Sequence, residues 1–402
     1  MIKKFLCFVI LLFAVCDARA AHVVNVEYVH NLISRYHNVD VLYNVNLGSP
    51  FMAVNMKYLL TAVDVANEKL NGYKTTNYAN SEYATGQVVD TVAANQAVKT
   101  LIKRVIEDEN TGDFWVVPAG TSTSFSFKIS AAGNYVIDWG DGSVVDVINK
   151  TDTNSTTYSH TYSNAASNYT VYVSGKATAY STSDEVAAVS FAGTLSNSWF
   201  GSGTPTSKIK SFDGCLGCVF GTLSDGTQPR FFETFANNPD IKSLPAGLFA
   251  GLRGQPADSM FSSTFNRCTG LKSLPEGIFD SFSGVPVYEM FNNTFSNCTS
   301  LASIPNGLFK HINGAPAEKM FNYTFEKCTK LTSIPSDLFG KIEGGAATNM
   351  FSYMFSGCTG LTGDSAKING EFLYNIWESG GTDMYANCSK LSDYSTMPSA
   401  WK

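Results

Sequence analysis

A 30-residue segment recurs without gaps through the second half of the chain, and this repetition constrains the fold more than any other feature. The stretch MFNNTFSNCTSLASIPNGLF at 290–309 represents it, and complete copies begin at Arg230, Met260, Met290 and Met320. A fifth copy from Met350 keeps its first half, and MYANCSKL at 384–391 stays in phase with it. One such unit is too small to bury its own apolar residues, whereas stacked units let each apolar position meet its equivalent. Because an extra residue would put every later position out of phase, the constant length predicts a stacked array.

Within each copy, the spacing of apolar residues changes midway and predicts two kinds of element. Apolar side chains four residues apart between 320 and 328 predict a helix, with Pro316 near its first turn. The segment LASI at 301–304 predicts a short strand that ends at Pro305. Each copy is therefore expected to form a strand, a turn and a helix.

The pattern F-x-x-C-x-x-L-x-S-I-P, which the copies share, resembles the leucine-rich repeats of bacterial surface proteins of the BspA-like type. The resemblance covers residues from about 180 to 395, with VAAVSFAGTL at 186–195 as the candidate N-terminal cap. It implies an α/β leucine-rich repeat solenoid with an extended binding surface. Each copy here also carries a G-x-P-A-x-x-M-F segment that typical family members lack, and a longer helix on the convex side is expected from it.

The segment before the repeats alternates aromatic and β-branched residues with polar ones. Strands are predicted in SFSFKIS, NYVIDWGDGSVVDVI, TTYSHTYS and NYTVYVSG, and Asp141-Gly142 predicts a tight hairpin turn. The residues WGDGS at 139–143, HTY at 160–162 and YTVYV at 169–173 resemble the PKD (polycystic kidney disease) domain. The resemblance implies an immunoglobulin-like β-sandwich that serves as a spacer or an adhesive module.

The N-terminal residues predict export. Lys3 and Lys4, the apolar run FLCFVILLFAV and the Ala18-Arg19-Ala20 motif are typical of a cleaved signal peptide, with an uncleaved anchor as the alternative. No later segment has 18 consecutive apolar residues, so no integral membrane span is expected in the mature chain. The predicted location is secreted or at the cell surface, which is the outer surface or periplasm if the cell is Gram-negative.

Four regions follow from these features. They are a signal peptide at 1–20, a helical N-terminal region at 21–112, a PKD-like β-sandwich at 113–177 and a leucine-rich repeat solenoid with caps at 178–402. Apolar stripes at helical spacing, such as the one between 56 and 70, are the basis for the helical region. That region carries no catalytic signature, and a spacer or packing module is the expected role.

Cysteine is placed regularly, with one residue per copy at Cys268, Cys298, Cys328, Cys358 and Cys388. A metal or redox array would use such a ladder, but five equivalent side chains cannot all pair, and Asn238 takes the position in the first copy. Buried thiols that pack as small apolar groups are the favoured interpretation. For Cys215-x-x-Cys218, a local disulfide is favoured over a redox site or half of a zinc site.

Charge and motifs argue against several function classes. A net charge of −6 without a basic run disfavours nucleic acid as a partner. The five histidines are scattered, and no Ser-His-Asp, H-E-x-x-H or phosphate-cradling motif occurs, so neither an enzyme nor a bound cofactor is predicted. Asp138 and Asp141 are possible calcium ligands, but the turn explains Asp141 without a metal, and no metal site is predicted.

The prediction for function is an exported, non-enzymatic binding or adhesion protein whose solenoid surface contacts an extracellular protein or glycan. Residues that stay the same in every copy are assigned to the scaffold, and contacts are sought where the copies differ. The candidates lie beside the predicted strand and after the following Pro: Lys242, Lys272, Ala302, Thr332, Glu276, Asn306 and Ser336. The alternatives are an accessory module or divergent enzyme of extracellular carbohydrate processing, and a self-associating structural surface protein.

Overall fold

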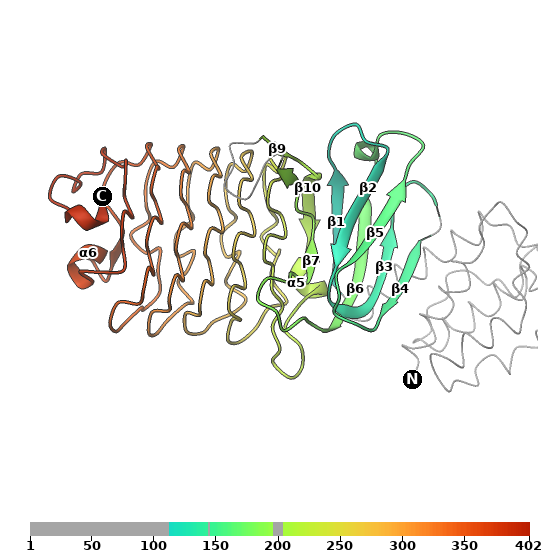
Figure 1. The fold of residues 1–402 in the computed structure, drawn as a ribbon, viewed down its shortest axis with the longest axis horizontal. Coiled ribbons are helices and arrows are strands. Elements are labelled where there is room, and N and C mark those ends of the chain that lie inside the picture. The colour runs from blue at the N-terminus through green and yellow to red at the C-terminus, as the bar shows by residue number, and fades with distance from the viewer. Residues whose placement is uncertain (1–111, 144, 196–203) are drawn as a thin grey trace, which may run out of the picture. The chain divides into compact units, whose positions relative to one another are not determined.

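The computed structural model describes residues 112–143, 145–195 and 204–402 of the 402-residue chain (Figure 1). The predicted signal peptide at 1–20 lies outside the described residues, as does the predicted helical region at 21–112 apart from Gly112. Residues 112–134, 139–141 and 149–402 form one compact unit.

Antiparallel strands between 112 and 214 form two sheets, consistent with the predicted β-sandwich. One sheet has the strand order β10-β1-β6-β3-β4 and the other β5-β2-β7. Side chains alternate in burial along β1, where Phe114 and Val116 are buried between more exposed neighbours, as expected of a sheet covered on one face. The bounds are β1 Gly112–Pro118, β2 Ser124–Ile129, β3 Ala132–Asp138, β4 Asp146–Lys150, β5 Thr156–Thr161, β6 Val171–Ala179, β7 Val189–Ser190 and β10 Ile209–Gly214.

The four predicted strand segments correspond to β2, β3 with β4, β5 and β6. Two further strands, β7 and β10, come from the range assigned to the solenoid, yet they pair with β2 and β1. Short elements complete this region: the 3-10 helix η3 Ala166–Asn168 and the paired strands β8 Thr194–Leu195 and β9 Pro205–Thr206.

The WGDGS turn is held by aromatic and polar contacts. Gly140 and Gly142 have φ angles of 81° and 87°, the left-handed region that glycine tolerates best. The His160 ring stacks on Trp139 at 5.2 Å, and its Nε2 lies 2.8 Å from Asp141 Oδ2. Asp141 therefore has a structural partner beyond its place in the turn.

The predicted helix in each copy is wrong. Residues 230–364 contain no helix, and the M-F-x-x-T-F-x-x-C segment forms a series of turns (Figure 1). Left-handed residues recur every four positions, for example Ser259, Ser263 and Arg267 with φ of 55°, 56° and 59°. A left-handed residue in every turn prevents a continuous α-helix, although the apolar spacing of four is the same.

The predicted strand is also much shorter than expected. Near LASI at 301–304 the structure has an isolated parallel bridge, Ser273↔Ser303, and a hydrogen bond of 3.1 Å from the Ala302 N–H to the Lys272 carbonyl. Copies are joined mainly through the turns. In the second copy, the N–H groups of Phe261, Ser263 and Phe265 donate to carbonyl oxygens of the third copy at 2.8–3.0 Å.

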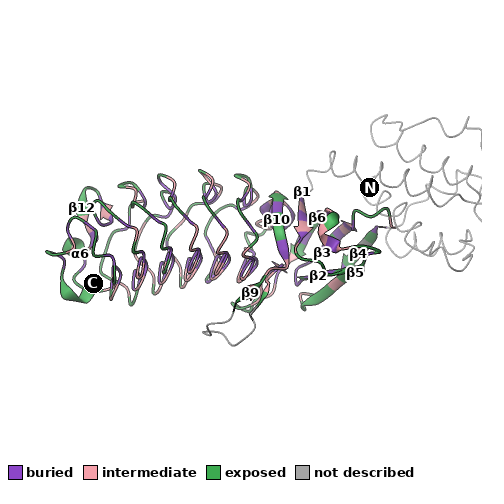
Figure 2. Cartoon of the chain, turned by 90° about the horizontal axis from the view of Figure 1, so that it is seen from above, coloured by how far each residue is buried: buried purple, intermediate pink, exposed green. Residues whose placement is uncertain are grey.

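Phenylalanine ladders fill the interior of the repeats, where Figure 2 shows the buried residues. In one ladder, successive ring centroids of Phe261, Phe291, Phe321 and Phe351 lie 5.4, 5.5 and 5.7 Å apart. In the other ladder, the rings of Phe235, Phe265, Phe295, Phe325 and Phe355 lie 5.3–5.5 Å apart. All of these side chains are fully buried, so truncating one to Ala removes about 3–5 kcal/mol of stability.

The β-sandwich and the first copy share one core. The N–H of Phe191, just after β7, donates to the Thr234 carbonyl at 2.8 Å. Beyond β10, Gly217 in helix α5 (Leu216–Val219) donates its N–H to the Leu248 carbonyl at 2.8 Å. Each sheet thus contributes a segment that lies against the first copy, and ring contacts continue across the junction: Phe114–Phe212 at 5.2 Å, Phe212–Phe235 at 5.0 Å and Phe191–Phe235 at 5.8 Å.

Asn238 of the first copy is hydrogen-bonded to the start of β10 and to the segment that follows β7. Its fully buried Oδ1 accepts hydrogen bonds from the N–H groups of Lys208 and Ile209 at 2.8 and 2.9 Å. Its Nδ2 donates to the carbonyls of Phe191 and Phe235, both at 2.9 Å. A thiol at this position offers a weak acceptor and a weak donor, so the departure from Cys in the first copy has a structural reason.

After the fifth copy, an inserted segment precedes the in-phase fragment. It contains β11 Lys367–Ile368, β12 Glu371–Phe372 and α6 Leu373–Ile376. The fragment keeps its phase, because the Phe355 N–H donates to the Met384 carbonyl at 2.9 Å and Gly363 forms a parallel bridge with Leu391. The 3-10 helix η4 (Ser399–Trp401) then places the buried Trp401 against it, with a 2.8 Å hydrogen bond from the Tyr385 N–H.

Replacing Asn238 by the Cys of the other copies tests this junction. Asn238→Cys leaves the buried N–H of Ile209 and the half-buried N–H of Lys208 without their acceptor, and we expect the protein to lose about 2–4 kcal/mol of stability. Urea unfolding followed by circular dichroism measures the change. The control, Asn306→Ala at an exposed position, should stay within about 0.5 kcal/mol of the parent. An Asn238→Cys variant with the parent's unfolding midpoint would refute the role of the amide.

Candidate functional site

All seven predicted contact residues are exposed, and four of them form one continuous row. The Lys272 N–H donates to the Lys242 carbonyl, and the Ala302 N–H to the Lys272 carbonyl, both at 3.1 Å. Thr332 Oγ1 lies 3.4 Å from the Ala302 carbonyl, and the Thr362 N–H continues the row to Thr332 at 2.9 Å. We call this row, Lys242, Lys272, Ala302, Thr332 and Thr362, the strand column.

The other three candidates form a separate row. Glu276 and Asn306 each precede a glycine with positive φ, Gly277 at 71° and Gly307 at 61°. Ser336 is the equivalent residue in the next copy, and all three are exposed. A Pro lies in the chain between this row and the strand column. The two groups of predicted contact residues therefore occupy separate positions within each copy.

Two rows of hydroxyl side chains flank the strand column. Each keeps one residue type through four successive copies, with Pro239 in place of Thr in the first copy and Gly363 in place of Ser in the fifth. The serine row follows the column directly and is exposed: Ser243, Ser273, Ser303 and Ser333. The threonine row precedes it and is half-buried to exposed: Thr269, Thr299, Thr329 and Thr359. Constancy had assigned these residues to the scaffold, but their side chains lie outside the core.

Sequence reasoning also missed a face formed by the turns. The second residue of each x-x pair after a Phe lies there, half-buried to exposed, and the rings of Tyr323 and Tyr353 stack on it at 4.7 Å with an interplanar angle of 1°. The first residue of the pair is buried in several copies, as at Ser262 and Ser352. Ser296 Oγ and Glu326 Oε2 are 3.0 Å apart across two copies. The predicted helix had removed these positions from consideration, although their variation between copies is the signal that selected the strand column.

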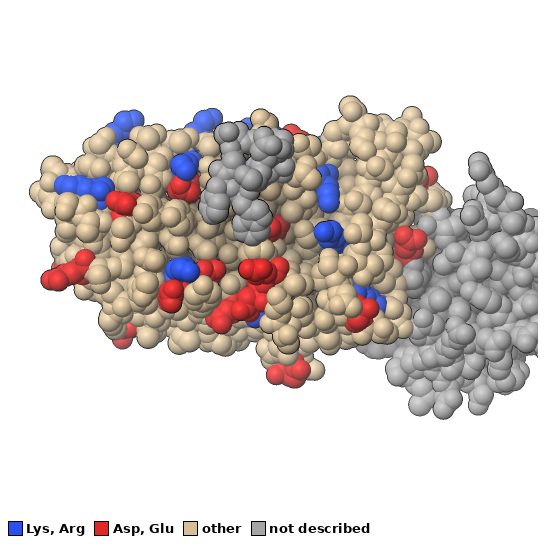
Figure 3. Space-filling view, in the orientation of Figure 1, with Lys and Arg blue, Asp and Glu red and all other residues tan. Residues whose placement is uncertain are grey.

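Charged side chains are spread thinly over the repeats. In the face drawn in Figure 3, Asp and Glu side chains gather in one patch, and Lys and Arg side chains lie mostly singly. Lys319 is 3.0 Å from Glu289 and 3.2 Å from the Tyr288 hydroxyl. The hydrogen bond to Glu289, followed by the one to Tyr288, raises the pKa of Lys319 to about 12. Lys319 therefore stays charged throughout the physiological range.

The five repeat cysteines are free and buried, as predicted. Each Sγ lies 3.0–3.2 Å from the carbonyl oxygen of a Phe in the preceding copy, so each thiol also serves as a donor between copies. Burial raises the pKa of Cys268 to about 12, and it raises the pKa of Cys298 and Cys328 well above the usual thiol value. The reactive thiolate is therefore scarce at neutral pH.

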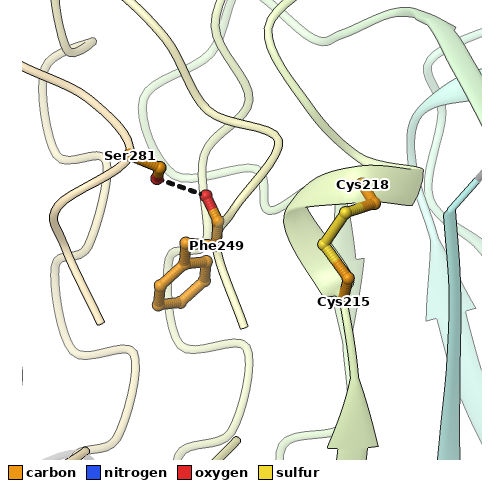
Figure 4. The surroundings of a disulfide bond; sticks show 4 residues. All are labelled: Cys215, Cys218, Phe249 and Ser281. Atoms are coloured by element: carbon orange, nitrogen blue, oxygen red, sulfur yellow. Dashed lines mark hydrogen bonds between the residues drawn. A yellow bond between two sulfur atoms is a disulfide. The ribbon is translucent and has the colours of Figure 1, made fainter. Parts of the chain in front are cut away.

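The prediction of a local disulfide between Cys215 and Cys218 is confirmed, with Cα atoms 5.2 Å apart (Figure 4). The bond spans α5, next to the first copy. A Cβ on Gly217, between the two cysteines, would lie 2.8 Å from backbone atoms of Phe249, so the glycine permits this close approach. In the same contact region, Ser281 Oγ donates to the Phe249 carbonyl at 2.5 Å.

Metal-binding and membrane-spanning features are absent from the part of the chain that the structure describes. Within it, no group of three or more His, Cys, Asp or Glu side chains is placed to hold a metal ion. The described helices, all short, include none with the length and hydropathy of a membrane span.

The thiol ladder predicts selective resistance to alkylation. With iodoacetamide at pH 8, we expect the five repeat cysteines of the folded protein to react at least about a hundredfold more slowly than in urea, because the thiols are buried and protonated. Peptide mass spectrometry measures each position. Rapid labelling of Cys298 or Cys328 in the folded protein would contradict the packing role.

No protein-family model, curated protein or solved structure matches the chain.

Proposed function

We propose that the repeats form a leucine-rich repeat solenoid, similar to the BspA-like type, in an exported, non-enzymatic cell-surface protein. The solenoid binds an extracellular protein or glycan through its exposed rows. Hydrogen bonds between copies and two stacked Phe ladders support this proposal, because they hold the backbone of every copy in the same place.

The strand column is the observation that carries the proposal. Its backbone is fixed by the hydrogen bonds between copies, while its side chains change from Lys242 and Lys272 to Ala302 and Thr332. A backbone that is already ordered has little conformational entropy left to lose when a partner binds. Different side chains on one rigid frame give a surface that can be specific without altering the core.

Binding of the full chain to arrays of glycans and extracellular-matrix proteins tests the proposal. We expect saturable binding, and a loss of about tenfold or more (~1.4 kcal/mol) in the Lys242→Glu, Lys272→Glu variant. The control, Arg253→Glu with Lys341→Glu, makes the same charge change at exposed positions outside the strand column and should bind like the parent.

Two results would overturn the proposal. One is binding that is unaffected by the strand-column variant. The other is polymerisation of the chain without any ligand, which would favour a self-associating structural protein.

A further inference from the structure

The two hydroxyl rows recur through the repeats although packing of the core does not require them. Serine recurs at 243, 273, 303 and 333, and threonine at 269, 299, 329 and 359, although neither row is buried in the core. Among the described residues, a threonine of the row donates to its neighbour only through a long hydrogen bond, 3.5 Å from Thr329 Oγ1 to the Thr299 carbonyl. These hydroxyls are therefore available to a ligand.

The spacing of the copies restricts which ligand can use them all. Backbone hydrogen bonds of 2.9–3.1 Å join residues of the strand column, so neighbouring copies are about 4.8 Å apart there, and the Phe rings inside are 5.3–5.7 Å apart. One pyranose residue in an extended β-1,4-linked chain has a comparable length. A glycan of this kind that lies along the stack would meet the same Ser and Thr hydroxyls at each sugar.

The charges beside these rows indicate the kind of sugar. Lys242, Lys272, Lys330 and Lys390 are exposed within or next to the rows, and Asp240 and Asp364 are the exposed acidic residues among them. Asp364 is paired with Lys367 at 2.7 Å, and Asp393, at the serine-row position of the last fragment, is buried. The carboxylates of Glu276 and Asp337 lie farther along the coil, after the Pro. This local excess of lysine contrasts with the net charge of −6 for the whole chain and favours an anionic ligand.

The positions of two lysines agree with one linkage. Lys330 and Lys390 occupy equivalent places two copies apart, with Gly360 between them. In an extended β-1,4-linked chain, each sugar is turned over relative to the last, so carboxylates on one side recur at every second residue. Lys330 and Lys390 can then pair with carboxylates of alternating sugars.

From these observations we infer that the face formed by the strand column and the two hydroxyl rows binds a linear β-1,4-linked polyuronate, with one sugar per copy. The inference rests on the proposed function and names its ligand class. The side chains are exposed, so each copy contributes little, and affinity comes from many copies engaged on one chain.

Calorimetric titration of the full chain with β-1,4-linked mannuronate oligomers tests the inference. We expect affinity to rise from dimer through tetramer to hexamer and to level off at octamer, because the strand column spans five copies and Lys390 adds a sixth. Added salt should weaken binding. The Lys330→Gln, Lys390→Gln variant should bind about tenfold more weakly, and Thr329→Val, which keeps the side-chain shape, about threefold more weakly. The control is Arg253→Gln with Lys341→Gln.

Three results would overturn the inference: neutral β-1,4-linked glucose oligomers binding equally well, the dimer binding as tightly as the hexamer, or the control variant losing as much as the Lys330 and Lys390 variant. If a protein or a neutral glycan binds through the strand column instead, this inference fails and the proposed function stands. If the strand-column variant changes the binding of no partner, the proposed function fails as well.

Discussion

Hydrogen bonds from alternate backbone N–H groups of each turn segment to the next copy are the interaction on which the repeats depend. In the third copy, Phe291, Asn293, Phe295 and Asn297 donate forward at 2.7–2.9 Å, while the residues between them donate three positions back within their own turn. This alternation needs a left-handed residue every four positions, which is costly for residues other than glycine. The bonds between copies offset that cost, and they bring the Phe rings, the Thr hydroxyls and the Cys thiols into register.

Much of this was predictable from the sequence. The 30-residue period, the stacking of equivalent apolar residues, the β-strands around WGDGS, the buried thiols and the Cys215–Cys218 disulfide all follow from spacing and residue type. The sequence did not distinguish a helix from this series of turns. Both place apolar residues four positions apart on the buried side, and the residue types do not specify the φ angles. Asn238 looked like a tolerated exception, since three of its partners, Phe191, Lys208 and Ile209, are distant in the sequence. Strands β7 and β10 were also not predicted, because they pair with β2 and β1, which are distant in the sequence.

For the candidate site, the structure agrees with the sequence that the variable residues are exposed. It differs for some residues that recur in the copies, because these are exposed as well. Variation between copies identified the strand column, and the structure brings its residues together. Recurring residues were assigned to the scaffold, which agrees with the burial of Phe295 and Cys298, whereas Ser303 and Thr329 are exposed. A regular array of exposed hydroxyls suits a ligand that is itself regular, whereas the variable rows suit discrimination between ligands. Both properties follow from the same fixed period.

The central claim is that register between copies holds the repeats together, and a pair of insertions tests it directly. One variant receives a second copy of residues 290–319, which adds one full period, and the other receives a single Ser after Asn293. Urea unfolding measures the stability of both variants. The variant with the added copy should have a midpoint equal to or above that of the parent. The single residue should lower the free energy of unfolding by several kcal/mol, because the bonds to the fourth copy lose their register. If the single Ser is tolerated as well as the full copy, register between copies is not what stabilises this structure.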